Sequence, residues 1–164
     1  MEFHEINQKL KETRNELLGL LHRMNRDQIN HRKDPNSWSV GQICQHLYKT
    51  EEIYVVAIKR GLKSKESSNT DSKSLDFLLD RSKKIVAPDI VQPTDEIIEL
   101  DEIIEKLNQS RQKLLETLSI LEDRSELSRK HFVHPVFKEM LLIDWVRSLY
   151  VHEQRHIRQI EEII

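Results

Sequence analysis

Glycine and proline are scarce in this chain, with three glycines and four prolines among 164 residues. The glycines stand about twenty residues apart, at Gly19, Gly41 and Gly61, so a glycine-rich phosphate-binding loop cannot be assembled. A β-sandwich or β-barrel needs a turn signal about every 8–12 residues, and the chain has too few turn-forming residues for that pattern. This scarcity predicts a helical protein and excludes nucleotide binding through a glycine-rich loop.

Cysteine is rarer still, because Cys44 is the only one. A single thiol excludes an internal disulfide framework and a cysteine-rich zinc site, and we expect Cys44 to be a small core residue. No uninterrupted apolar run approaches the roughly 20 residues that a membrane span needs, and the start of the chain lacks the charged-then-apolar pattern of a secretion signal. The sequence therefore predicts a cytoplasmic protein without a membrane-spanning segment.

The chain also lacks an excess of charge of either sign. It has 26 basic and 28 acidic side chains and a formal net charge of −2. Domains that bind nucleic acids usually carry a strong basic excess, so we expect no nucleic-acid partner.

What the chain has in quantity is apolar residues at helical spacing. Four long segments show this pattern: Phe3 to Met24, Val40 to about Gly61, Thr94 to about Asp123, and Glu139 to Ile164. Ser39 and Gln42 form a capping-box pattern at the start of the second segment. A polar loop and a short predicted helix, Leu75–Val86, fill the connection of about thirty residues between the second and third helices. The pattern predicts one all-α domain over residues 1–164, a four-helix bundle whose long crossover lets helices two and three run parallel.

Two histidines occupy core positions on the fourth predicted helix. His152 and His156 lie close to the centre of the apolar stripe that contains Trp145 and Leu149. Burying a polar group without a partner costs roughly 1–3 kcal/mol, and two imidazoles cannot satisfy all four ring nitrogens between themselves. Histidines at positions i and i+4 lie on one side of a helix, about 6 Å apart, where both can bind one cation. The pair therefore predicts a metal site.

The pair also matches the HExxH pattern of zincin proteases, as His152-Glu153-Gln154-Arg155-His156. A zincin needs a third ligand further along the chain, and the acidic residues available are Glu161 and Glu162. Both follow His156 on the same helix by only five and six residues, where they are poorly placed to reach the same ion. The sequence therefore disfavours a protease.

His46, on the second predicted helix, is the better third ligand. It lies at the edge of the apolar arc, where a bundle helix still faces its neighbours. Taken alone it is more often a satisfied core histidine, but the pair on the fourth helix favours the metal. Three histidines leave coordination positions open for water or substrate, as in a catalytic zinc site. His131 and His134 could reach the rim of such a site, whereas we expect the remaining histidines, His4, His22 and His31, to be solvated.

Three further charged residues fall in or beside the predicted core. Glu153 has three interpretations: it orients a histidine, acts as general base on metal-activated water, or pairs with Arg147 or Arg155. Glu51 and Arg111 are both costly to bury alone, so we expect them to pair with each other. Alternatively, Arg111 binds an anionic group of a substrate.

Two segments resemble the DinB-like family of four-helix-bundle proteins, which includes YfiT-like proteins assigned as metal-dependent hydrolases and bacillithiol S-transferases. The first, Trp38-Ser39-Val40-Gly41-Gln42-Ile43-Cys44-Gln45-His46-Leu47, is similar to the family's helix entry that carries the first ligand. The second comprises His134-Pro135, Leu142-Ile143-Asp144-Trp145 and residues 152–160, and is similar to the ending that supplies two more ligands.

The resemblance implies a divalent metal, zinc or nickel, bound by His46, His152 and His156, and commonly a homodimer. It also implies a thiol S-transferase or hydrolase that acts on a small-molecule thiol or electrophile. For such an enzyme, the position of Glu153 beside the histidine pair makes it the candidate catalytic residue. Two alternatives stay open. One is a bundle that binds metal without catalysis, and the other is a metal-free helical interaction module in which the histidines pair with carboxylates such as Glu51.

Overall fold

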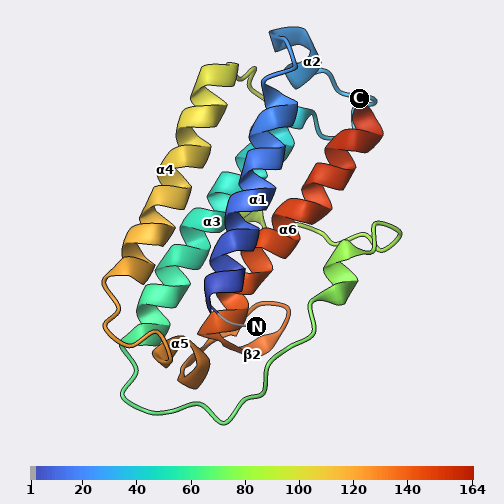
Figure 1. The fold of residues 1–164 in the computed structure, drawn as a ribbon. Coiled ribbons are helices and arrows are strands. Elements are labelled where there is room, and N and C mark those ends of the chain that lie inside the picture. Colours follow the sequence, from blue (N-terminus) through green and yellow to red (C-terminus); the bar gives the residue numbers. More distant parts are fainter. Residues whose placement is uncertain (1–2) are drawn as a thin grey trace.

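The computed structural model describes residues 3–164, and Met1 and Glu2 lie outside the described residues. Its four long helices are α1 (Phe3–Leu21), α3 (Val40–Leu62), α4 (Leu100–Ser119) and α6 (Leu142–Ile163). Figure 1 shows them packed lengthwise, with α3 and α4 running in one direction and α1 and α6 in the other. The predicted all-α four-helix bundle, with parallel second and third long helices, is confirmed.

The helix starts follow the local sequence. The capping box predicted before α3 is present: Ser39 Oγ accepts from the Gln42 backbone N–H at 3.1 Å, and Gln42 Oε1 accepts from the Ser39 N–H at 2.9 Å. A second capping box, from Asn25 and Gln28, begins the short helix α2 (Arg26–Asn30), which the apolar pattern did not predict. α1 ends at Leu21, before the predicted Met24.

The core of the bundle has three layers along the helix axes. One apolar cluster lies toward the end that carries α5 (Glu126–Arg129) and contains Leu10, Leu114 and Leu149. Another lies toward α2 and contains Leu17 and Leu107. Along each long helix, buried charged side chains fall between the residues of these two clusters. The bundle therefore has a polar layer between two apolar ones.

The third long helix begins later than predicted, at Leu100 instead of Thr94. The preceding residues are held in a non-helical conformation by side chains from elsewhere. The Asn30 amide bonds both backbone groups of Ile98 at 2.9 Å, and Gln45 Oε1 accepts from the Thr94 N–H at 2.8 Å. Ile97, which lies inside the range predicted to be helical, is 62% exposed as a result.

The fourth long helix also begins later than predicted, at Leu142 instead of Glu139. The residues before it form a hairpin of β1 (His131–His134) and β2 (Lys138–Leu141), with His131 paired to Leu141. Lys138 has a φ of 62°, in the left-handed region that favours glycine. A short apolar run does not distinguish a strand from a helical turn, so the apolar pattern alone extends the predicted helix back to Glu139.

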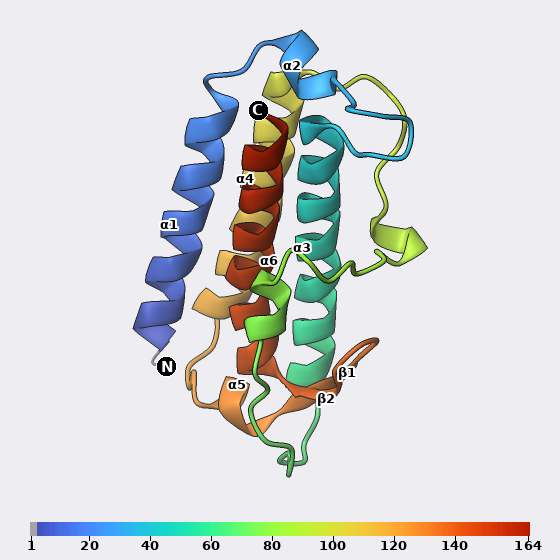
Figure 2. The same cartoon turned by 90° about the vertical axis from the view of Figure 1, so that its right-hand side faces the viewer.

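The crossover between α3 and α4 contains two 3₁₀ turns, η1 (Asp76–Leu79) and η2 (Asp89–Val91), and the helix predicted for Leu75–Val86 is wrong. Val86 is 86% exposed. Figure 2 shows the crossover passing along α6 and then across to α3. Arg155 of α6 donates hydrogen bonds to three of its backbone carbonyls, on Leu78, Asp80 and Lys83, at 2.7–3.0 Å. These carbonyls are therefore committed to a tertiary contact instead of to a helix.

Within residues 3–164, no helix combines the length and the apolar character that crossing a membrane requires.

Candidate metal centre

The structure brings together the three histidines that the sequence singled out. His46 comes from α3, and His152 and His156 come from successive turns of α6. The Nε2 atom of His152 lies 2.9 Å from Nε2 of His46 and 3.1 Å from Nε2 of His156. One potential ligand atom from each ring falls within 4.8 Å of the others. We call these three residues the histidine cluster.

Two of the rings are oriented by hydrogen bonds on their far side. His46 Nδ1 lies 2.9 Å from the Val91 carbonyl oxygen in the crossover, and His156 Nδ1 lies 2.7 Å from Gln159 Oε1. Both oxygens only accept, so each Nδ1 carries the proton and each Nε2 has a free lone pair. This arrangement, with Nδ1–H donated to a carbonyl and Nε2 directed at a shared point, is the usual one for a histidine that binds a metal.

All three imidazoles are held in the neutral form. Burial lowers the pKa of His46, and burial together with the neighbouring imidazoles lowers the pKa of His152 well below its ordinary value. Burial and the neighbouring His46 lower the pKa of His156 to about 3. Neutral imidazole is the form that binds metal ions, so no proton has to be displaced at neutral pH.

A count of protons shows that the cluster fits a cation. His46 and His156 present lone pairs on Nε2, and His152 has at most one Nε2 proton, which it can donate to only one of them at a time. Within residues 3–164 no carboxylate joins this group. A cation at the meeting point would accept all three lone pairs, which the rings alone cannot satisfy.

The histidine cluster is covered unequally by its surroundings. The Trp38 ring packs against His46 with a centroid separation of 5.2 Å, and η2 of the crossover lies over the same residue. His46 and His156 are buried, whereas His152 is partly exposed. Solvent exposure within the cluster is therefore greatest at His152.

Glu153, the predicted catalytic residue, lies in a different group of side chains. Its carboxylate accepts from Arg14 Nε at 2.7 Å and from an Arg111 terminal nitrogen at 2.9 Å. The predicted partners of Glu153 are wrong: Arg147 pairs with Asp144, and Arg155 binds the crossover. Both oxygens of Glu153 are engaged by arginines, so the geometry does not support a general base here.

Glu153 belongs to an ion-pair cluster with one residue from each long helix: Arg14, Glu51, Arg111 and Glu153. The predicted Glu51–Arg111 pair is confirmed at 2.8 Å, and Arg14 completes the cluster with a 3.3 Å contact to Glu51. Burial alone would raise the pKa of Glu51, but the charges of Arg111 and Arg14 bring it below its ordinary value. Arg14 was missed, although an arginine on the apolar stripe of α1 between Leu10 and Leu17 is a signal that the sequence contained.

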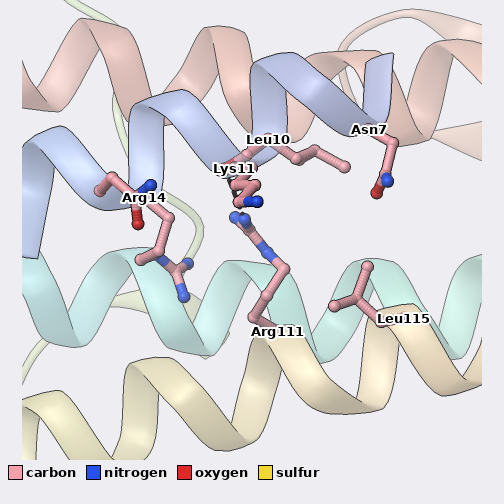
Figure 3. A pocket seen from close by; sticks show the side chains of 7 residues that line it. Asn7, Leu10, Lys11, Arg14, Arg111 and Leu115 are labelled. Carbon is pink, nitrogen blue, oxygen red and sulfur yellow. Dashed lines mark hydrogen bonds between the residues drawn. The ribbon is translucent and has the colours of Figure 1, made fainter. Parts of the chain in front are cut away.

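The side chain of Arg111 is committed to this cluster and to α1. It donates to Glu51, to Glu153 and to the Leu10 carbonyl oxygen. A surface pocket of about 330 Å³ lies between α1 and α4. Figure 3 shows Arg14 and Arg111 among the side chains that line it. Because Glu51 and Glu153 already balance both guanidinium groups, Arg14 and Arg111 offer no unpaired charge to an anionic group of a substrate.

The other histidines and the cysteine lie outside the histidine cluster. His134 Nδ1 accepts from the Val136 N–H at 3.0 Å, so its Nε2 donates to the Tyr54 hydroxyl at 2.9 Å; burial lowers the pKa of His134 to about 4. His131 contacts Ser68. His4, His22 and His31 are exposed, as predicted, and Cys44 is fully buried, with a thiol pKa raised to about 12 by burial. His131 and His134 therefore belong to the hairpin, and Cys44 belongs to the apolar core.

Comparison with known proteins gives a consistent result. A family model described as the DinB superfamily matches residues 9–160. The uncharacterized protein YuaE of Bacillus subtilis (strain 168) is 28% identical over 158 residues, which cover 96% of this chain and 94% of that protein. The crystal structure of TT2238, a four-helix bundle protein, superposes with a TM-score of 0.66 at 19% identity, covering 98% of this chain and 99% of TT2238. The structural likeness shows the fold alone.

Proposed function

The chain belongs to the DinB superfamily, and from that premise we propose that it binds a divalent metal ion, zinc or nickel, through His46, His152 and His156. In this proposal the site acts on a small molecule as a thiol S-transferase or hydrolase. The observation that carries the proposal is the convergence of three neutral imidazoles whose Nε2 atoms have too few protons to satisfy one another.

The donor set suits a catalytic site better than a structural one. Structural zinc sites are closed by four protein ligands, whereas three protein ligands leave room for an exogenous molecule. A divalent cation held there would act as a Lewis acid and lower the pKa of a thiol or water, so that a strong nucleophile is available at neutral pH. The chain's own residues keep the imidazoles neutral and shield His46 with Trp38, while His152 is partly exposed.

The metal-free alternative loses its proposed partner. It required buried carboxylates such as Glu51 to pair with the histidines, but Glu51 instead accepts from Ser110, Arg14 and Arg111. A bundle that binds metal without catalysis keeps the same three ligands. An activity assay separates that alternative from an enzyme.

Metal content is the first test. We expect untagged protein to bind close to one equivalent of zinc or nickel, and His152→Ala to lose that binding, measured by elemental analysis and titration calorimetry. The exposed His22→Ala variant is the matched control and should bind as the unmodified protein does. Less than about a tenth of an equivalent, with no difference between His152→Ala and the control, would refute the metal site.

Activity is the second test. Conjugation of bacillithiol, glutathione and cysteine to a model electrophile should proceed faster with the metal-loaded protein than with the chelated protein or with His152→Ala. Rates equal to the uncatalysed reaction for every thiol would remove the transferase and leave the hydrolase, for which ester and amide substrates are assayed in the same three preparations.

The proposal also includes a homodimer, which the family resemblance implies. Light scattering on the purified protein should then give twice the 19.6 kDa of the single chain.

A further inference from the structure

Gln159 is the side chain that meets the far face of His156. It follows His156 by three residues on α6, and residues at this spacing share one face of a helix. Its Oε1 lies 2.7 Å from His156 Nδ1. A carboxamide oxygen has no proton to give, so this bond forms only when Nδ1 is protonated.

We propose that Gln159 is a positioning residue for metal binding: it selects the tautomer of His156 whose lone pair is on Nε2 and holds that ring toward His46 and His152. This inference rests on the proposed function, because it concerns how the same three histidines bind their metal. It assigns to Gln159 a role that acts through His156.

The physical reason lies in the two neutral tautomers of imidazole. A ring without a partner on Nδ1 can carry its proton on either nitrogen, and the form protonated on Nε2 cannot bind a metal through that atom. An acceptor at Nδ1 favours the binding form, raises the basicity of Nε2 and restricts rotation of the ring. Losing such an outer contact typically lowers metal affinity by about 10–100-fold.

His46 shows the same arrangement with a different kind of acceptor. Its Nδ1 donates to the backbone carbonyl of Val91, which any residue at that position would provide. The acceptor of His156 is a side chain and depends on the identity of residue 159. Substitution at this position can therefore test the contact without altering a ligand.

The experiment compares zinc affinity by competition with a chromophoric chelator in the full-length protein. Gln159→Leu removes the acceptor at similar size and should bind zinc about 10–100-fold more weakly. Gln159→Glu keeps an oxygen acceptor and should stay within about threefold of the unmodified protein or bind more tightly. Gln154 lies on the same helix and its side chain makes no hydrogen bond within residues 3–164, so Gln154→Leu is the matched control and should not change affinity.

Two further measurements separate positioning from folding. Thermal unfolding of the metal-free variants identifies any loss of structure, and Gln159→Ser, which removes the acceptor without adding apolar bulk, replaces Gln159→Leu if the latter does not fold. The visible absorption bands of the cobalt-substituted protein should shift in Gln159→Leu and be restored in Gln159→Glu, because they report the ligand geometry directly.

Equal zinc affinity in the unmodified protein and Gln159→Leu would overturn the inference while leaving the three-histidine site intact. The same loss in Gln159→Leu and Gln159→Glu would also overturn it, because the shape of residue 159 would then matter and its acceptor oxygen would not. Absence of zinc binding in the unmodified protein would instead refute the proposed function.

Discussion

The ion-pair cluster and the histidine cluster are both buried groups of polar side chains, yet their chemistry differs. In the ion-pair cluster two guanidinium groups meet two carboxylates, so the charges balance and each oxygen has donors. In the histidine cluster three neutral rings direct Nε2 atoms at one point with too few protons to share. The comparison teaches that a count of donors and acceptors separates a structural polar core from a ligand site, whereas burial alone does not.

The two clusters also draw on different parts of the chain. The ion-pair cluster takes one side chain from each long helix and joins the whole bundle. The histidine cluster uses only α3 and α6, with the crossover behind His46. We therefore expect the first to control stability and the second to control ligand binding.

The largest expected effect is from Glu51→Gln, which leaves an excess of buried positive charge beside Arg14 and Arg111. Removing one partner of a buried ion pair typically costs about 3–5 kcal/mol of unfolding free energy, to be measured by urea denaturation of the metal-free protein. The control is Glu52→Gln, since Glu52 is partly exposed and forms no salt bridge within residues 3–164. A loss of unfolding free energy below about 1 kcal/mol would mean that the ion-pair cluster contributes little to the stability of the fold.

The next effect concerns the ligand site. In His46→Asn the shorter amide can still donate to the Val91 carbonyl, but the Nε2 ligand is lost. At zinc near 100 times the dissociation constant, the unmodified protein should gain about 2.7 kcal/mol of stability, and this gain should vanish in the variant. Denaturation with and without zinc measures both quantities, with His22→Asn as the exposed control. If His46→Asn retained the zinc-dependent gain, His46 would not be a ligand.

The pH dependence of the unfolding free energy of the metal-free protein also distinguishes the buried histidines from the ion-pair cluster. Burial lowers the pKa of His46, and it lowers that of His134 to about 4, whereas an unfolded histidine titrates near 6.5. Stability should therefore be complete above about pH 6.5 and fall as the pH drops below it, because the unfolded state takes up protons that the folded state excludes.

Each such histidine contributes at most about 1.4 kcal/mol per pH unit. Glu51, whose pKa is lowered in the folded protein, begins to reduce stability only as the pH falls to the ordinary glutamate pKa of about 4.3, which is below the range of this experiment. Urea denaturation between pH 7.5 and 5 should show the slope, and His46→Asn should reduce it. A flat profile over this range would contradict the pKa shifts of the buried histidines.

The smallest expected effect on zinc binding comes from a substitution that releases the crossover. Arg155→Met removes the hydrogen bonds to the carbonyls of Leu78, Asp80 and Lys83, each worth roughly 0.5–1.5 kcal/mol. Amide exchange in residues 78–91 should increase, and zinc affinity should fall by about threefold to tenfold, because the Val91 carbonyl orients His46. The exposed Arg158→Met, which removes one such bond, should have a smaller effect. Faster exchange without any change in affinity would show that the crossover does not support the site.

Much of the site could be predicted because helical periodicity states which side chains face inward. His46, His152 and His156 lie on the inner faces of their helices, and Glu51 and Arg111 could be paired because each is costly to bury alone. The predicted partners of Glu153 are wrong because periodicity shows that a residue faces inward but does not show which helix it meets.

The sequence by itself determined the helical class, the four long helices, the parallel course of the second and third, and the residues that approach one another in the histidine cluster. These features depend on local spacing and on the cost of burying polar groups. Only the tertiary structure decided where α4 and α6 begin, the hairpin before α6, the non-helical crossover and the partners of Glu153. At the start of α4, in the crossover and at Glu153, the backbone or a charged side chain is bound by residues far away in the chain, such as Asn30, Gln45 and Arg155, and a contact of that kind leaves no periodic pattern in the sequence. The hairpin and the start of α6 depend on strand pairing, which a short apolar run does not distinguish from a helical turn.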